Sequence, residues 1–327
     1  MTAPWRAILV RLTLLAAGTA VALLAGEATL RIAGFEYQPL PRLQFGWPDP
    51  ATMANLYVPD PDLLWVPRDY SRVIRSARRN RPAIAFLGDS CTEFGGYPKQ
   101  TLEILSARRP ELATGVKLGV GGWTTEQGLA QLRRDVLPWR PRVVTIYFGW
   151  NDHWIALGPP DAEIHRARLL RRFSKRSRLA QLLVKAWMAF SSKGEEHPNR
   201  VDLPRYVANL ESMIRLAREA GIQPILITAP SGHRPGFEPR YLAERHLRKL
   251  SDLVPLHQSY VEATRRAARE SGALLCDVAW AFRLLPPPAE RYFLEDGIHL
   301  TPEGNREVAR ILSGCVESAN LPAPGSR

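Results

Sequence analysis

Three residues from distant parts of the chain carry the side chains of a nucleophilic site. Ser90 ends the sequence AIAFLGDS, an apolar run followed by a turn, and Asp296 and His299 lie near the other end, in EDGIHLTPEGN. A serine hydroxyl becomes a good nucleophile when a base takes its proton, and an imidazole base works best when a third group fixes its tautomer. The order serine, aspartate, histidine therefore indicates acyl-ester chemistry.

Two segments between these ends place glycine or asparagine just beyond a predicted strand. Residues 116–129, VKLGVGGWTTEQGL, predict a short strand, a glycine turn and a helix with Thr124 or Thr125 as N-cap. Backbone N–H groups at such a turn can bind developing negative charge, although a tight turn needs glycine in any case. Residues 142–154, RVVTIYFGWNDHW, predict a buried strand followed by Asn151, whose amide could point at an oxyanion or cap a helix.

These blocks resemble the SGNH/GDSL hydrolase family. The family pattern is Gly-Asp-Ser, then a glycine, then Gly-x-Asn-Asp, then Asp-x-x-His. The chain has GDS at 88–90, GVGG at 119–122, GWND at 149–152 and DGIH at 296–299. Order and spacing match, and the resemblance covers residues 82–316.

The resemblance implies a catalytic triad. Ser90 would be the nucleophile, His299 the base and Asp296 the residue that orients His299. The chain departs from the family in one place, because Cys91 stands where relatives usually carry a larger or hydroxyl residue. That departure leaves the triad intact.

The resemblance also implies an oxyanion hole and a reaction. The hole would consist of the Ser90 N–H, the Gly122 N–H and the Asn151 side chain, with Gly121 as an alternative to Gly122. The expected enzyme is a serine esterase that hydrolyses acyl esters, including O-acetyl groups on envelope carbohydrate or lipid. Two alternatives stay open: an O-acyltransferase with the same site, and a non-catalytic binding protein that retains the fold. No cofactor or metal is implied, and the sequence has no metal-ligand spacing.

Three tryptophans flank the oxyanion segments and are candidate substrate contacts. An indole face at Trp123, Trp150 or Trp154 could stack on a sugar ring or hold an acyl chain, or could belong to the core. Trp150 and Trp154 follow a strand end, so we expect these two to be exposed.

The other histidines carry weaker signals than His299. His153 follows Asn151, and His233 lies in a loop after the fourth predicted strand, so both are candidate substrate contacts. His246 and His257 lie in helical patterns and are expected on the surface.

Composition limits the class of protein. The chain has 327 residues, a net charge of +12 and three cysteines. Such an excess of basic residues is typical of proteins that bind nucleic acid, a membrane surface or an acidic polymer. The interleaved aromatic and basic residues of an RNA-binding sheet are absent, so no nucleic-acid partner is expected. The cysteines predict no disulfide framework, and Cys276, in the apolar run ALLCDV, is expected as a buried core residue.

The N-terminal segment predicts a membrane location. Residues 7–25 read AILVRLTLLAAGTAVALLA, with Arg11 as their one charge. We expect residues 1–33 to form an uncleaved single-pass anchor, with the catalytic domain outside the cytoplasm, either periplasmic or extracellular. The alternative is a signal peptide that is cleaved to release a secreted protein.

The remaining pattern alternates strands and helices. The predicted strands are 83–87, 116–119, 143–148, 224–228 and 273–277, and the predicted helices are 99–108, 125–136, 203–220, 256–271 and 301–313. This rhythm predicts a flavodoxin-like three-layer αβα fold with a five-stranded parallel sheet, beside the N-terminal hydrophobic helix and a helical insertion. Ligands of such sheets bind at the carboxyl ends of the strands.

The expected domains are the N-terminal segment, a linker over 34–81 and an SGNH hydrolase-like domain over 82–327. Prolines predict an extended linker packed on the domain, with a basic turn at 76–82. The domain contains an insertion over 155–202 that is expected to border the active site, either as an amphipathic helix on a membrane or as a lid. Its basic residues are Arg166, Arg168, Arg171, Arg172, Lys175, Arg176, Arg178 and Lys185.

Overall fold

The computed structural model describes residues 4–37, 55–156, 159–166, 173–174, 176–191, 198–244 and 246–319. Part of the predicted linker and several basic residues of the insertion lie outside this range; the latter are Arg168, Arg171, Arg172 and Lys175.

A five-stranded parallel sheet forms the centre of the protein, with strand order β4-β3-β5-β6-β7. The strands are β3 (Ile84–Gly88), β4 (Gly115–Lys117), β5 (Val143–Tyr147), β6 (Gln223–Ile227) and β7 (Leu274–Cys276). All five lie within two residues of the predicted strands. Residues of β3 and β5 are buried on both faces, as expected of strands covered by helices on each side.

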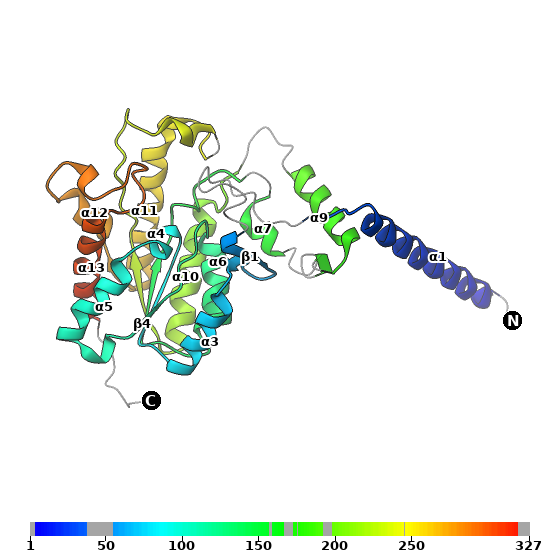
Figure 1. Ribbon diagram of the computed structural model, residues 1–327, viewed down its shortest axis with the longest axis horizontal. Coiled ribbons are helices and arrows are strands. Elements are labelled where there is room, and N and C mark those ends of the chain that lie inside the picture. The colour runs from blue at the N-terminus through cyan, green and yellow to red at the C-terminus, as the bar shows by residue number, and fades with distance from the viewer. Residues whose placement is uncertain are drawn as a thin grey trace.

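Helices cover both faces of the sheet, so the predicted three-layer αβα fold is confirmed (Figure 1). One apolar core joins the sheet to four helices: α3 (Tyr70–Asn80), α6 (Thr125–Gln131), α10 (Leu203–Glu219) and α11 (Leu253–Ser271). The second core joins it to two others: α5 (Tyr97–Arg108) and α13 (Pro302–Glu317). Shorter helices are α4 (Ser90–Glu93), α7 (Asp161–Arg166) and α12 (Val278–Arg283), with a π-helical turn over Leu132–Val136 and 3₁₀ turns at Pro110–Leu112, Arg240–Glu244, Leu250–Asp252 and Ala289–Arg291.

The segment before β3 is more regular than its prolines predict. A two-stranded antiparallel hairpin, β1 (Tyr57–Asp60) and β2 (Leu64–Pro67), precedes α3. The expectation of extended chain with a turn at 76–82 is therefore wrong over α3. Tyr70, Ile74 and Ala77 recur at helical spacing and are buried, so this part of the segment belongs to the core.

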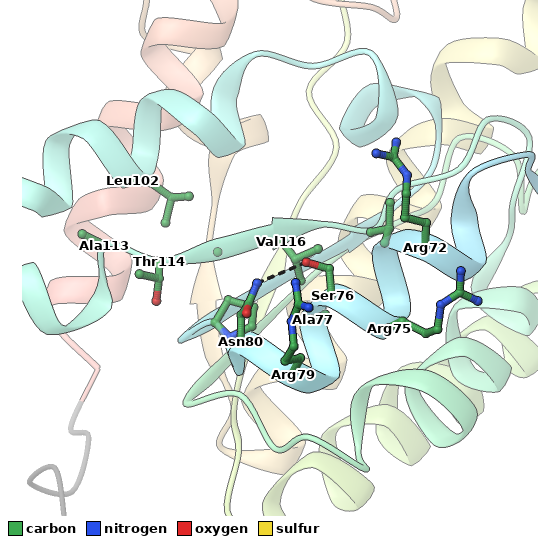
Figure 2. A pocket seen from close by; sticks show the side chains of 13 residues that line it. Arg72, Arg75, Ser76, Ala77, Arg79, Asn80, Leu102, Ala113, Thr114 and Val116 are labelled. Carbon is green, nitrogen blue, oxygen red and sulfur yellow. Dashed lines mark hydrogen bonds between the residues drawn. The ribbon is translucent and has the colours of Figure 1, made fainter.

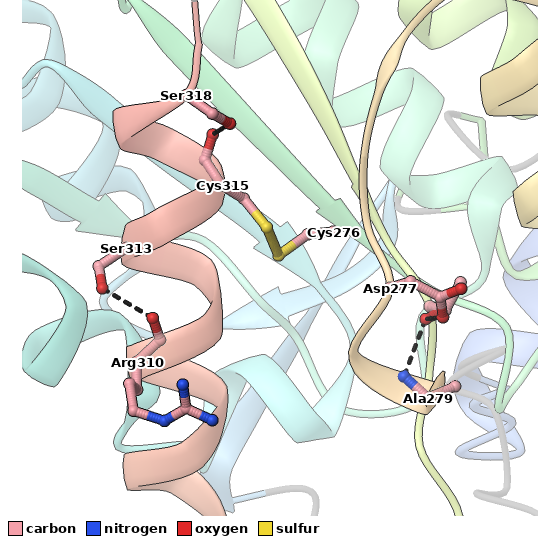
Figure 3. Close-up of a disulfide and its surroundings, with 8 residues drawn as sticks. Cys276, Asp277, Ala279, Arg310, Ser313, Cys315 and Ser318 are labelled. Atoms are coloured by element: carbon pink, nitrogen blue, oxygen red, sulfur yellow. Dashed lines mark hydrogen bonds between the residues drawn. A yellow bond between two sulfur atoms is a disulfide. The ribbon is translucent and has the colours of Figure 1, made fainter. Parts of the chain in front are cut away.

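A disulfide links Cys276 at the end of β7 to Cys315 in α13 (Figure 3). The predicted burial of Cys276 is confirmed. The sequence predicted no disulfide framework, whereas the fold brings β7 and α13 together and sets the two Cα atoms 5.8 Å apart. Cys91 is a free, buried cysteine.

The predicted N-terminal hydrophobic helix is α1 (Pro4–Ile32), which projects from the rest of the protein (Figure 1). Its apolar part, Trp5–Ile32, is long enough to cross a membrane and is the one such helix among the residues that the structure describes.

The helical insertion leaves and rejoins the domain at one place. Its two ends pair through the bridge between Ile155 and Asn199, and the Arg200 N–H donates to the Trp154 carbonyl oxygen over 2.7 Å. The helices described within it are α7 and α9 (Arg178–Ser191).

A surface cavity of about 1040 Å³ lies between α3 and the edge strand β4 (Figure 2). Its lining includes Pro82 and Thr114, which precede β3 and β4. The cavity is therefore at the amino end of the sheet, opposite the strand ends where the predicted site lies.

Candidate active site

A tight turn after β3 presents Ser90. Asp89 is the N-cap of α4, and its Oδ1 accepts a hydrogen bond from the Cys91 N–H over 2.9 Å. A side chain at Gly88 would collide with Thr92 Oγ1 and come within 2.7 Å of the Tyr147 carbonyl oxygen, so this position requires glycine. The turn thereby places Ser90 just beyond the carboxyl end of a central strand.

The fold brings Asp296 and His299 to Ser90. His299 Nε2 lies 2.8 Å from Ser90 Oγ, and His299 Nδ1 lies 2.5 Å from Asp296 Oδ2. The other carboxylate oxygen, Asp296 Oδ1, accepts from the backbone N–H groups of Ile298 and His299, each over 2.8 Å. These bonds fix the carboxylate and leave one oxygen for the imidazole.

The charges of Asp296 and His299 favour an imidazole that can accept a proton. Burial raises the pKa of Asp296, but its hydrogen bonds and the charge of His299 outweigh burial and lower that pKa below its usual value. Burial lowers the pKa of His299, yet its hydrogen bond to Asp296 and the carboxylate charge raise it overall. The carboxylate accepts from Nδ1–H, so in the neutral imidazole Nε2 is free to take the proton of Ser90.

The predicted oxyanion donors follow three neighbouring strands. Ser90, Gly122 and Asn151 come after β3, β4 and β5, whose carboxyl ends meet at one edge of the sheet. Gly122 has a φ of +79°, which favours glycine. The Gly121 N–H already donates to Glu93 Oε2 over 2.5 Å, which leaves Gly122 as the better donor.

Two of these donors are unpaired within the described part of the chain. Asn151 is 4% exposed, and its Nδ2 has no hydrogen-bond partner there; the Gly122 N–H has none either. Buried donors without a partner are rare and call for an explanation. A substrate oxygen would supply the missing acceptor.

A buried ion pair supports the Gly122 turn. Arg200 Nη1 donates to the Gly122 carbonyl oxygen over 2.8 Å, and Arg200 Nη2 lies 2.8 Å from Asp161 Oδ2. Both side chains are 5% exposed. Thr124 Oγ1 and Gln127 Nε2 also donate to Asp161 Oδ2, each over 3.0 Å, which ties the helical insertion to the start of α6.

Arg200→Met should lower the free energy of unfolding by about 3–5 kcal/mol, because it leaves Asp161 as a buried charge without its partner. Chemical denaturation measures this loss. The matched control is Arg215→Met, which removes an ion pair whose two side chains are each 57% exposed and should cost about 1 kcal/mol or less. Equal losses in the two variants would contradict a special role for the buried pair.

The tryptophans predicted as substrate contacts lie in the core. Trp150 and Trp154 are 2% and 3% exposed, so the expectation that both are exposed is wrong. Trp123 is fully buried and donates from Nε1 to the Trp65 carbonyl oxygen. Trp150 stacks on His257 with ring centroids 3.8 Å apart. Segments distant in sequence cover these indoles, which leaves no open face for a substrate.

Buried histidines share this core. His153 is fully buried, and its Nε2 lies 3.3 Å from His257 Nδ1, while His257 Nε2 donates to the Ala229 carbonyl oxygen over 3.0 Å. Burial lowers the pKa of His257 to about 3. The expectation that His246 and His257 lie on the surface is wrong, since both are buried. His153 therefore packs inside the protein and offers no contact to a substrate.

His233 contacts the turn that carries Asp296. Its Nε2–H donates to the Asp296 carbonyl oxygen over 2.8 Å, and its Nδ1 accepts from Ser231 Oγ over 3.1 Å. Gly297, at φ +67°, lies so close that an added Cβ would be 2.6 Å from His233 Nε2. His233 thus braces the turn that carries Asp296.

His233→Phe should lower kcat/KM about tenfold, because the Asp296 turn loses a hydrogen bond worth about 1 kcal/mol and the Asp296–His299 contact loosens. His233→Gln retains an N–H donor and should restore most of the activity. Kinetics with an activated ester measure both. Equal losses in the two variants would contradict the bracing role.

A serine hydroxyl bonded to an imidazole that is bonded in turn to a carboxylate defines the serine-hydrolase class of site. Residues 86–307 match the model of the GDSL-like lipase/acylhydrolase family, so the chain belongs to that family and is a hydrolase of ester bonds.

The chain is similar to curated esterases and to solved lipases. It is 28% identical over 175 residues to an isoamyl acetate-hydrolyzing esterase 1 homolog from Bos taurus (52% of this chain, 66% of the relative), and 26% identical over 234 residues to the homolog from Mus musculus (68% and 77%). The bovine match thus spans just under two thirds of that protein. Similar structures are a putative GDSL-like lipase from Parabacteroides merdae (17% identity, TM-score 0.48, 72% of this chain and 94% of that one) and the lipase/acylhydrolase from Enterococcus faecalis (17%, 0.48, 74% and 98%).

Proposed function

We propose that this protein hydrolyses acyl esters through a covalent intermediate on Ser90. The observation that carries the proposal is the continuous hydrogen-bonded set Asp296–His299–Ser90. His299 Nε2 takes the hydroxyl proton as Ser90 Oγ attacks the ester carbonyl carbon, and then returns that proton to the leaving alcohol oxygen. Water repeats the sequence on the acyl-enzyme and frees the acid and Ser90.

The negative charge of each tetrahedral intermediate is bound by the N–H groups of Ser90 and Gly122 and by the Asn151 amide. The unpaired state of Asn151 Nδ2 supports this assignment. Donors fixed in place before the reaction stabilise the developing oxyanion without reorganising.

Asn151→Ala should lower kcat about 10²–10³-fold with a much smaller change in KM, because the amide meets charge that exists only in the transition state. Steady-state kinetics on an activated ester measure the split. A change in KM alone would contradict the oxyanion role.

The acyl group we propose is short, with acetate as the first choice, and the alcohol part is a carbohydrate or a lipid. The names of the bovine and mouse relatives, which specify isoamyl acetate, support the acetyl group. If an alcohol replaces water in the second half-reaction, the same residues perform acyl transfer.

We propose that α1 is a retained anchor and that the catalytic domain lies outside the cytoplasm. The length and apolar character of α1 support the anchor. The Cys276–Cys315 disulfide supports an oxidising compartment, since such bonds are rare in the cytosol.

Labelling with a fluorophosphonate tests the proposed nucleophile. The full-length protein should be modified at Ser90, as located by mass spectrometry, and Ser90→Ala and His299→Ala should abolish the label. Absence of label on folded protein would overturn the proposal. A panel of acetyl and longer esters, with and without added alcohols, then separates hydrolysis from acyl transfer.

A further inference from the structure

The end of α1 caps the first turn of α9. Glu27 Oε1 accepts from the Arg178 N–H over 3.0 Å, while Glu27 Oε2 accepts from the Leu179 N–H over 3.0 Å and from Ser177 Oγ over 2.9 Å. The first N–H groups of a helix have no partner within the helix, and a carboxylate both pairs with them and matches the positive end of the helix dipole. Glu27 thus caps α9, although about 150 residues of sequence separate the two. Such a cap usually comes from a residue next to the helix that it caps.

Further contacts reinforce this joint. Arg31 Nη2 donates to the Arg176 carbonyl oxygen over 2.7 Å, and Arg31 Nε pairs with Glu27 over 2.7 Å. Leu179 lies against Gly26, where an added Cβ would be 3.5 Å from Leu179 Cδ1. The contacts combine hydrogen bonds, an ion pair and apolar packing, as a fixed helix–helix joint requires. Figure 1 shows α9 near the C-terminal end of α1.

The joint lies where a bilayer would end. From Ala7 to Gly26 the helix covers about 20 residues, or about 30 Å at 1.5 Å per residue, which matches the hydrocarbon thickness of a membrane. Arg11 falls within this stretch and can reach the headgroups with its long side chain. Glu27 and Arg31 follow directly, so the joint with α9 comes immediately after the apolar stretch.

The outer face of α9 is apolar and exposed. Ala180 and Val184 are buried on its inner face, whereas Leu183 and Phe190 are 58% and 71% exposed. Leu182 is exposed on the same outer face, and Lys185 is an exposed basic residue of the same helix. Apolar residues on one face with an interspersed lysine are the pattern of a helix that lies in a membrane interface.

We propose that α9 lies in the headgroup region of the bilayer that α1 spans, with Leu182, Leu183 and Phe190 directed into the acyl chains. Glu27 holds α9 in this position. This inference rests on the proposed retention of α1 and is independent of the catalytic mechanism. Because the chain rejoins the domain at Arg200, which hydrogen-bonds the Gly122 turn, the membrane contact is connected to the oxyanion side of the site.

The alternative of a lid over the site fits this helix less well. A lid directs its apolar face at the cleft that it covers, whereas the apolar face of α9 is exposed and its inner face is already packed. The capping by Glu27 also ties α9 to α1, which restricts the swing that opening would need.

Depth-dependent fluorescence quenching tests the proposal on the full-length chain. Cys91 is buried and the other two cysteines form the disulfide, so a single introduced cysteine can be labelled selectively. Leu183→Cys and Phe190→Cys receive an NBD fluorophore, and the protein is reconstituted in vesicles of phosphatidylcholine and phosphatidylglycerol, with and without a nitroxide-bearing phosphatidylcholine. The matched control is Leu284→Cys after α12, a leucine whose exposure of 68% lies between those of Leu183 and Phe190. Leu15→Cys, within α1, reports insertion of the anchor.

The expected result is strong nitroxide quenching at positions 183, 190 and 15, and little at 284. Glu27→Ala should reduce quenching at 183 and leave it unchanged at 15. Quenching at 183 and 190 no stronger than at 284, with 15 quenched, would overturn the interfacial position of α9 while the anchor stands. No quenching at 15 would overturn the anchor and the inference with it, and an unchanged signal at 183 in Glu27→Ala would overturn the role of Glu27.

Discussion

Ser90→Ala should lower kcat about a millionfold, and His299→Ala should cost nearly as much, because neither residue can form the acyl-enzyme without the other. The double variant should be no worse than either single variant. A residual rate of about 10³–10⁴ over water is expected in all three, since the oxyanion donors still bind the polarised carbonyl. Single-turnover kinetics with an activated acetate ester can measure rate constants over this range.

Ser76→Ala is the matched control for this series. Ser76 lines the cavity at the amino end of the sheet, far from the strand ends that carry Ser90 (Figure 2). Its loss should leave the rate near that of the unaltered protein. A Ser90→Ala variant that keeps even a few per cent of activity would exclude the serine nucleophile, and losses that multiply in the double variant would show that Ser90 and His299 act separately.

The parts of the site that follow strand ends were accessible to sequence reasoning. Ser90, Gly122 and Asn151 each come directly after an apolar run, and in a parallel sheet such positions converge whatever the details of packing. Asp296 and His299 are three residues apart, so one turn suffices to bring their side chains together. Local pattern and topology thus indicate where these five residues lie, whereas the roles proposed for them rest on the family resemblance.

What the sequence did not reveal depends on contacts between distant segments. The indoles of Trp150 and Trp154 follow a strand end, which favours exposure, but His257 and His246 from remote elements pack against them. The Cys276–Cys315 pairing needs β7 and α13 to be adjacent, which three cysteines in a sequence do not indicate. Nor does any local signal mark Glu27 as the cap of a helix some 150 residues away.

Asp296→Asn should lower kcat about ten-thousandfold by imposing the wrong tautomer on His299. The oxygen at the Oδ1 position accepts from two backbone N–H groups, so the amide oxygen of the asparagine will occupy it. Its NH₂ group then faces His299 Nδ1 and makes that atom an acceptor. The ring proton moves to Nε2, which can no longer take the proton of Ser90.

The pH profile provides a second readout of the same variant. In the unaltered protein the charge of Asp296 outweighs burial and raises the pKa of His299 above 6.5, so kcat/KM should rise with pH through a midpoint above 6.5 as the imidazole becomes neutral. Without that charge, burial dominates and lowers the pKa, so the acid limb of Asp296→Asn should move to lower pH. Burial raises the pKa of the nearby Asp89 to about 6.

Asp89→Asn separates charge from orientation, because it removes a carboxylate near Ser90 that has no contact with His299 Nδ1. Asp89 is only a minor contributor to the pKa of His299, so this variant should shift the acid limb slightly and lose far less activity than Asp296→Asn. Comparable losses in the two variants, with folding verified by thermal unfolding, would mean that the net negative charge, rather than the bond to Nδ1, sustains the reaction. A large loss confined to Asp296→Asn would assign to Asp296 the control of the His299 tautomer, on which the transfer of the Ser90 proton depends.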